Sequence, residues 1–408
     1  MKKLNAIPVA IALIYSTIPL YSTQTYAGQP RDPAACKLPT KIPDGNNRYQ
    51  HLAWQIFVAA NCDSGKTDLP LTWETWPEQD CLKSGKKDCT NNANQTRLHA
   101  SILATRNFDF KKTCQPMTTK DNAPSGAFLP FVPKNLTKNP EFCEEVHVNQ
   151  DAADFITSPS GKSVKYSLQT LPGQKDYVAN NGKINFPRTA IEIKVDWLPA
   201  SSIKEKLNCD IDSKEYYLEK IDGVCYAMVS FHLNSKLTNN WVWATFEPQS
   251  EITNPNRCKS DLYSNCNDPW GSSPPISNGQ VTSRTADLDT LIDKANLSIA
   301  FKNYRLVGVQ TNYTSGVDTP VRKPVLLGNS FTEFNAGVAP KKASCMTCHA
   351  YASFTSDTKP IVQNPYFGAF PGTQPIGLPA PLTNWTKQDF SWLLGVMPPN
   401  DFVSAGKK

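Results

Sequence analysis

The sequence predicts an α+β fold, in which a β-rich body stapled by disulfides precedes a short helical C-terminal segment. Four segments have the alternation or the aromatic and β-branched content of strands, and four others have helical spacing. Ten of the 12 cysteines lie before residue 270, and the other two lie after residue 340. This distribution divides the chain into a cysteine-rich body, residues 28–335, and a distinct segment, residues 336–408.

Residues 1–27 have the pattern of a cleavable signal peptide. Lys2 and Lys3 precede an apolar run, residues 6–21, and Thr25-Tyr26-Ala27 resembles a small-residue cleavage site. A membrane anchor is the alternative, but the run contains two prolines and is short for a bilayer span. We therefore expect an exported chain that is not an integral membrane protein after cleavage.

Cleavage there removes two lysines, so the formal net charge falls from +6 to +4. This weak basic bias favours docking to an acidic partner protein. It falls well short of the charge of a nucleic-acid-binding surface, and basic and acidic residues are interspersed. We therefore expect no nucleic-acid partner.

The body begins with a proline-rich stretch, followed by a helix predicted for residues 51–60. Leu52, Ile56, Phe57 and Ala60 lie on one side of that helix. A second short helix is predicted for residues 97–104. Residues 110–185 are rich in Lys, Asn, Pro and Thr, and we expect long loops with short elements there.

The strand signals follow. Residues 190–197 alternate apolar and charged side chains, as a half-buried strand does. Residues 225–233, 241–247 and 304–310 are apolar runs rich in aromatic and β-branched residues. These segments predict a twisted antiparallel sheet or a sandwich.

Two helices are predicted in the second half of the chain. Residues 288–300 have helical spacing and lie between two predicted strands. The last element is predicted for residues 386–396, with Thr386 as its N-cap and Phe390 among its apolar residues. Pro398 ends it.

The ten cysteines of the body are even in number, which predicts disulfides in an exported chain. Sequence leaves their connectivity open. Pairing each cysteine with its nearest neighbour gives Cys36–Cys62, Cys81–Cys89, Cys114–Cys143, Cys209–Cys225 and Cys258–Cys266.

The most informative motif is Cys345-Met346-Thr347-Cys348-His349, a C-x-x-C-H sequence. It is the attachment signature of c-type haem. Two thiols three residues apart reach the two vinyl groups of one porphyrin edge, and His349 then directs its imidazole at the iron. The motif predicts one covalently attached haem c, held by Cys345 and Cys348 and ligated by His349. Export agrees with this, because haem c is assembled outside the cytoplasm.

Three other interpretations of the motif remain open: a dithiol redox pair, a disulfide, and half of a zinc site. A thioredoxin-like pair normally opens a helix after a strand in a βαβ unit, whereas this pair follows a stretch rich in Gly, Asn, Ala, Pro and Lys. A zinc site needs a second pair of ligands, and no cysteine or histidine follows His349.

Five segments carry a resemblance to a known family: Ala53-Trp54-Gln55-x-Phe57, Thr72–Trp76, Asn240–Glu247, Tyr304–Gln310 and Ser344–Ala350. The chain resembles exported single-haem cytochrome c family proteins of Gram-negative bacteria. The matching segments span most of the chain. The resemblance implies a periplasmic haem protein with a short helical, cytochrome c-like haem segment at residues 336–408, and it implies no known substrate.

The resemblance to small cytochromes c also suggests two further haem-binding residues. Pro360 lies 11 residues after His349, where a proline of those proteins supplies a backbone carbonyl to the proximal histidine. Met397, followed by Pro398, resembles their axial methionine. In those proteins a helix follows the methionine loop, whereas here the predicted helix precedes Met397.

The body offers another candidate for the sixth iron ligand. His232 lies four residues after Met228 in a predicted strand, so the two side chains are expected to share a face. A histidine in an apolar strand is also an ordinary core residue. Met397, His232 and an open iron therefore remain alternatives.

Two classes of function follow. One is a periplasmic electron carrier or electron-accepting subunit that docks to a redox partner protein, which the modest basic bias and the single haem motif favour. The other is a haem enzyme, such as a peroxidase or oxidoreductase, or a haem-based sensor, which the large body favours. A single C-x-x-C-H excludes a di-haem peroxidase, and the sequence has no P-loop, nucleophile elbow or dinucleotide-binding glycine pattern.

Overall fold

The structure is a computed structural model, which describes residues 31–66, 70–83, 109–117, 136–137, 140–158, 167–203, 207–211, 213–249, 267–273, 283–315, 323–335, 343–350, 352–354 and 386–394. Several predictions fall outside these residues and stay predictions: the signal peptide, the helix at residues 97–104, Pro360 and Met397.

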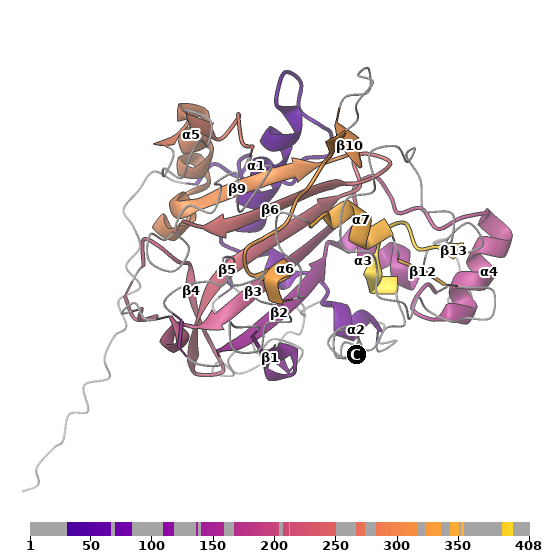
Figure 1. The fold of residues 1–408 in the computed structure, drawn as a ribbon, viewed down its shortest axis with the longest axis horizontal. Coiled ribbons are helices and arrows are strands. Elements are labelled where there is room, and N and C mark those ends of the chain that lie inside the picture. The colour runs from indigo at the N-terminus through magenta and orange to yellow at the C-terminus, as the bar shows by residue number, and fades with distance from the viewer. Residues whose placement is uncertain are drawn as a thin grey trace, which may run out of the picture.

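A seven-stranded antiparallel sheet forms the centre of the molecule (Figure 1). Its strand order is β1-β2-β3-β5-β6-β9, and β4 pairs with β5 beyond the end of β6. The strands are β1 (Cys114–Pro116), β2 (Glu141–Val148), β3 (Ile191–Pro199), β4 (Leu218–Ile221), β5 (Val224–Ser235), β6 (Val242–Pro248) and β9 (Tyr304–Gln310). All four predicted strands are confirmed, and each lies in this sheet.

The remaining strands in the described part of the chain form only two-stranded pairs, so the fold has one main sheet and is not a sandwich there. These pairs are β7 (Ser272–Ser273) with β8 (Ser283–Arg284), β10 (Thr314–Ser315) with β11 (Lys323–Pro324), and β12 (Ser353–Phe354) with β13 (Thr386–Lys387). Helices cover the sheet, which makes this an α+β arrangement.

One face of the sheet is apolar and is covered by α1 (Arg48–Ala60). This helix confirms the one predicted for residues 51–60. Phe57 stacks on Phe246 of β6 with ring centroids 4.3 Å apart and meets Phe231 of β5 edge-on at 5.0 Å. Burial of these aromatic rings supplies the main apolar contact between the helix and the sheet.

The hairpin between β4 and β5 shows how local sequence sets the register. Asp222 and Gly223 form its two-residue turn, with φ angles of 48° and 82°. Two positive φ angles in succession define the turn that matches the twist of paired strands, and Asp-Gly is favoured there because glycine has no Cβ. The turn places Ile221 opposite Val224.

A β-bulge in β5 corrects one prediction. The register between β3 and β5 shifts, so that Ser230 pairs with Asp196 while Met228 pairs with the next residue, Trp197. The extra residue reverses the alternation of side chains. Met228 therefore lies in the apolar cluster beneath α1, whereas His232 lies on the opposite face. The expectation that the two share a face is wrong.

Segments predicted as loops also form regular structure. Residues 110–185 contain β2, α3 (Gln150–Thr157) and α4 (Leu171–Asn181), besides the short β1. Asn149 caps α3 and Thr170 caps α4 through side-chain oxygens that accept backbone N–H groups. The cysteine and charged residues of β2 concealed its strand character, because only the pairing with β3 buries them.

One predicted helix is shorter than expected, and another does not form in the described residues. The helix predicted for residues 288–300 is α5 (Ala286–Ala295), which ends at Asn296 with a φ of 51°. No helix forms from residue 386 through residue 394: Thr386–Lys387 is β13, and Trp392–Leu394 is one 3₁₀ turn. Asp389 and Phe390 have φ angles of 52° and 69°, which a right-handed helix cannot contain.

Three predicted disulfides are confirmed: Cys36–Cys62, Cys114–Cys143 and Cys209–Cys225. Cys114–Cys143 links directly paired positions of β1 and β2. Cys81 is also disulfide-bonded, but Cys89, Cys258 and Cys266 lie outside the described residues, so the other two pairings stay predictions. Within the part of the chain that the structure describes, no helix has the length and apolar character needed to cross a bilayer.

Candidate functional site

The second face of the sheet is buried but polar. Lys194 of β3 pairs in register with His232 of β5, which in turn pairs with Thr245 of β6. Two short helices, α6 (Thr332–Asn335) and α7 (Cys345–Ala350), lie over this face, in front of the strands in Figure 1. The C-x-x-C-H motif is therefore on the face of the sheet opposite α1.

Gln310, the last residue of β9, anchors α7 to the sheet. Its side-chain oxygen accepts a hydrogen bond from the backbone N–H of Met346 at 3.0 Å, and its amide donates to Ser344 Oγ at 2.9 Å. Ser344 in turn accepts from the backbone N–H of Thr347, which satisfies a donor in the first turn of α7. Met346 and Ala350 pack in the hydrophobic cluster beneath the helix.

The three motif residues lie close together on α7. Cys345, Cys348 and His349 are spaced i, i+3 and i+4, which places their side chains along one side of the helix. All three are half-buried, and neither thiol is bonded to another cysteine. Two unbonded thiols next to an imidazole on one side of a helix are the donors that haem c requires, so these residues fit that group.

A hydrogen bond fixes the imidazole of His349. Its Nδ1 lies 2.8 Å from the backbone oxygen of Phe390, and a carbonyl oxygen only accepts, so Nδ1 carries the proton. The ring also lies 4.5 Å from the ring of Trp243. Burial lowers the pKa of His349 to about 4, so the imidazole is neutral at neutral pH. Nε2 therefore keeps its lone pair, as a metal ligand must.

The sequence suggested that a carbonyl of Pro360 bonds to this imidazole, and in the structure the carbonyl of Phe390 does so. A backbone carbonyl that accepts from the Nδ1–H of a ligating histidine orients the ring and raises its basicity. Phe390 supplies that carbonyl from a part of the chain 41 residues away. Whether Pro360 contributes as well stays a prediction, because it lies outside the described residues.

The environment of the two thiols disfavours a dithiol redox pair. Burial raises the pKa of Cys348 to about 12, and it raises that of Cys345 well above the ordinary value, to which the nearby Glu333 adds. A reactive pair needs the opposite, a thiol pKa lowered by positive neighbours or a helix N-terminus. The pair does open a short helix, but the surrounding sheet is antiparallel and contains no βαβ unit among the described residues.

A second set of potential ligands lies beside the motif. Ligand atoms of His232, Glu333 and Cys345 lie within 4.8 Å of one another. His232 is 8% exposed, and its Nε2 lies 2.7 Å from Thr332 Oγ1. Burial lowers the pKa of His232 well below its ordinary value, and the nearby Lys194 and His349 lower it further. His232 and the motif thus belong to one site.

Charged residues of the sheet form the floor of this site. Lys194 Nζ lies 2.6 Å from Glu144 Oε2, and Thr332 donates a hydrogen bond to Asp196. Burial raises the pKa of Asp196 to about 7, against the lowering effect of Lys194. Burial alone would lower the pKa of Lys194, but Glu144 and Asp196 raise it above its ordinary value. Buried charges of this kind persist in structures only where they are paired.

Sequence reasoning placed Cys345, Cys348, His349 and His232, and the structure brings these four together. It did not find Phe390, Trp243 or Glu333 as parts of the site. Phe390 acts through a backbone oxygen, which leaves no pattern in the sequence. Glu333 is the second residue of the short helix α6, and nothing in its sequence position points to Cys345.

No protein-family model, no curated protein and no solved structure matches this chain.

Proposed function

We propose that the chain is a periplasmic c-type cytochrome that carries one haem and transfers electrons to or from a redox partner protein. Cys345 and Cys348 hold the haem through thioether bonds, and His349 is an axial ligand of its iron. This proposal includes the export of the chain and its relation to single-haem cytochrome c family proteins. The weak positive charge expected for the mature chain suits an acidic partner surface.

The hydrogen bond between His349 Nδ1 and the Phe390 carbonyl is the observation that carries the proposal. A histidine held in this tautomer presents Nε2 as its free donor. The same arrangement is general for metal-ligating histidines, whose second nitrogen donates to a carbonyl or carboxylate. It supports His349 as a ligand independently of the C-x-x-C-H pattern.

Attachment needs only the two thiols. In each, the S–H adds across a vinyl group: a sulfur–carbon bond forms, and the hydrogen goes to the other vinyl carbon. Cys345 and Cys348 are unbonded and lie on the same side of α7. When bound, the haem supplies one-electron chemistry at its iron, and the protein sets the potential through the axial ligands and the surrounding polarity.

The sixth ligand separates an electron carrier from an enzyme or sensor. Among the described residues, His232 is the candidate that the site favours, because it faces the motif from β5. Met228 is not a candidate, since the bulge turns it into the apolar core. Met397 remains a candidate from sequence alone. A six-coordinate iron suits electron transfer, whereas an open iron suits a haem oxidoreductase, peroxidase or sensor.

A mononuclear metal site is a second candidate function, favoured by the close approach of His232, Glu333 and Cys345. Thiolate, imidazole and carboxylate are ligands of zinc, and copper also accepts the first two. The two candidates exclude each other, because Cys345 cannot be a thioether and a thiolate ligand in the same molecule.

The first experiment is to mature the exported protein in a host that assembles haem c and to extract it with acidic organic solvent. We expect the haem to stay with the wild-type protein and to be lost from Cys345→Ala/Cys348→Ala. Cys209→Ala/Cys225→Ala, which removes a disulfide of the body, serves as the control and should keep the haem. Haem that extracts from the wild type, or stoichiometric zinc or copper in its place, would contradict the proposal.

The second experiment reads the ligand state from visible spectra of the oxidised and reduced protein. A ferric band at about 695 nm that Met397→Ala abolishes identifies methionine as the sixth ligand. A low-spin spectrum without that band, which His232→Ala converts to high-spin, identifies His232. A high-spin wild type that binds carbon monoxide when reduced contradicts the electron carrier and supports an open iron.

A further inference from the structure

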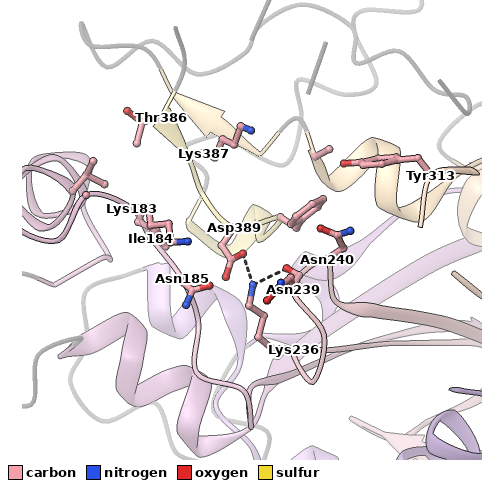
Figure 2. A pocket seen from close by; sticks show the side chains of 14 residues that line it. Lys183, Ile184, Asn185, Lys236, Asn239, Asn240, Tyr313, Thr386, Lys387 and Asp389 are labelled. Atoms are coloured by element: carbon pink, nitrogen blue, oxygen red, sulfur yellow. Dashed lines mark hydrogen bonds and ion pairs between the residues drawn. The ribbon is translucent and has the colours of Figure 1, made fainter. Parts of the chain in front are cut away.

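A cavity of about 620 Å³ lies beside the haem motif, between the body and the C-terminal segment. Most of its wall comes from the end of α4, the turn between β5 and β6, and the stretch that runs from β13 through Phe390 (Figure 2). Tyr313, which follows β9, and Ala350, the last residue of α7, complete the wall. Its volume lies within the range of sites that bind small organic molecules. None of the motif residues lines it, but Ala350 and Phe390, which adjoin the motif, do.

Positive charge dominates the lining. Lys183, Lys236 and Lys387 line the cavity, and Asp389 is the one carboxylate among the lining residues. Lys236 Nζ already lies 2.5 Å from Asp389 Oδ1, and both side chains are at most 9% exposed. The pair therefore forms a neutral floor, which Figure 2 shows at the centre of the cavity.

The other two lysines that line the cavity are in a position to bind a ligand. Lys183 and Lys387 are exposed, and neither has an ion-pair partner among the residues that the structure describes. Figure 2 shows Lys183 beside the end of α4 and Lys387 on β13, on different walls of the cavity. Two cations on different walls favour a ligand with two separate negative groups.

The other lining groups indicate an organic ligand. Asn185 and Asn240 supply side-chain amides, and Tyr313 supplies a phenol, so neutral donors and acceptors surround the charges. Ile184 and Phe390 contribute apolar surface to the cavity wall. A cavity of this size, with an apolar part and amides between two cations, suits a carbon chain with an acidic group at each end.

We propose that this cavity binds a small organic dicarboxylate, and that Lys183 and Lys387 pair with its two carboxylates. The sequence does not predict this site, because its residues come from segments that are distant in the chain. Binding itself does not depend on a haem, whereas its effect on His349 rests on the proposed function.

The wall that contains Asp389 connects the cavity to His349. Asp389 accepts hydrogen bonds from Lys236 Nζ at 2.5 Å and from the backbone N–H of Phe186 at 2.7 Å. The next residue, Phe390, supplies the carbonyl that accepts from His349 Nδ1. Both Asp389 and Phe390 have positive φ angles, an unfavourable conformation for such residues that these contacts maintain. A ligand against this wall is therefore expected to alter the hydrogen bond to His349.

Calorimetric titration of the matured protein with glutarate tests the binding. Glutaramide, which has the same carbon chain without charge, and inorganic phosphate are the matched ligands. We expect glutarate to bind, glutaramide not to bind, and phosphate to bind more weakly. Lys183→Gln and Lys387→Gln should each weaken glutarate binding by about twofold to fivefold, as exposed ion pairs do, and the double variant should weaken it further.

Lys220→Gln is the control, because Lys220 is exposed on β4 and does not line the cavity. It should bind glutarate as the wild type does. The proposal is overturned if glutarate gives no binding heat with the wild type, if the double variant binds it unchanged, or if phosphate binds more tightly than glutarate.

The visible spectrum of the same samples tests the connection to His349. A glutarate-dependent shift that follows the calorimetric affinity supports it. If a haem-carrying protein binds glutarate without a spectral shift, the cavity remains a dicarboxylate site, but its connection to His349 is overturned. A protein without haem contradicts the proposed function, and calorimetry still tests whether the cavity binds glutarate.

Discussion

The two faces of the central sheet differ in chemistry and in what stabilises them. The apolar face meets α1 through aromatic and aliphatic side chains, and burial of that surface favours folding directly. The polar face buries Asp196, Glu247 and Arg305 beneath the segments that carry the C-x-x-C-H motif. Desolvation of those charges opposes folding, and their pairing only compensates for it.

The two faces therefore have different roles in the molecule. The face that stabilises the fold contains none of the proposed haem ligands, and the face that contains them gains little stability from its charges. Clusters of buried titratable groups with shifted pKa values are typical of functional sites. Variants on the two faces should therefore differ in which property they change, stability or the state of the site.

The largest effect on stability is expected from Phe57→Ala on the apolar face. Phe57 is fully buried and contacts the rings of Phe231, Phe246 and Phe301. Removing the ring leaves a cavity and should lower the free energy of unfolding by about 3–5 kcal/mol, measured by urea denaturation. Val224→Ala, at a position that is 37% exposed, should change it by less than about 1 kcal/mol. Equal effects of the two would contradict the assignment of the core.

The next effect is expected from Arg305→Met on the polar face. Arg305 Nη2 donates to Glu247 Oε1 at 2.6 Å, and both side chains are at most 3% exposed. The substitution leaves a buried carboxylate without that partner and should cost about 3–5 kcal/mol.

A second change on the same pair tells pairing apart from packing. Arg305→Met/Glu247→Gln removes both charges and keeps an acceptor for the backbone N–H of Ser330. We expect the double variant to recover more than half of the loss in urea denaturation. A double variant as unstable as Arg305→Met would show that arginine packing, and not charge pairing, matters at this position.

A smaller effect is expected from pH. Burial raises the pKa of both Glu192 and Asp196, on the polar face, to about 7, well above the values of an unfolded chain. The folded protein therefore binds more protons than the unfolded chain between about pH 4 and pH 7, and stability falls as the pH rises through that window. We expect the Tm to be higher at pH 5 than at pH 8 by a few degrees.

Glu192→Gln removes one of these groups and should make the Tm less dependent on pH. Asp151→Asn, at an exposed position on α3, should leave the dependence unchanged. A wild-type Tm that rises from pH 5 to pH 8 would contradict the assignment of these carboxyl groups as buried and destabilising when charged.

The smallest effect is expected from Asp389→Asn, which weakens the contacts that hold the Phe390 carbonyl against His349. In the proposed cytochrome, a weaker hydrogen bond makes the His349 imidazole less basic, so it stabilises the ferric iron less. The reduction potential of the matured protein should rise by about 20–60 mV, the equivalent of one ordinary hydrogen bond in a one-electron couple. Asp151→Asn is again the control, and a fall in potential in Asp389→Asn would reverse the argument.

Patterns within one element predicted the apolar face well. Alternation predicted a strand at residues 190–197, which differs from β3 (Ile191–Pro199) by one residue at the start and two at the end. The prediction for residues 304–310 matches β9 from end to end. The helical spacing of Leu52, Ile56 and Ala60 predicted α1. In each, the residues that face the core repeat with the period of the element, so local sequence is sufficient.

The polar face was harder to predict, because contacts between distant segments form it. The bulge in β5 leaves no mark in an apolar run, yet it moves Met228 to the other face. The apolar spacing of residues 386–396 resembles a helix, but Asp389 and Phe390 take positive φ angles. Their contacts with Lys236 and His349 override the local preference.

The central claim is that Cys345 and Cys348 carry the haem, and mass spectrometry of the protease-digested mature protein tests it most directly. We predict that the peptide with both cysteines appears with the added mass of one haem, and that the haem persists through denaturation and acid extraction. The same peptide with two unmodified thiols, or with Cys345 and Cys348 joined as a disulfide, would contradict the claim.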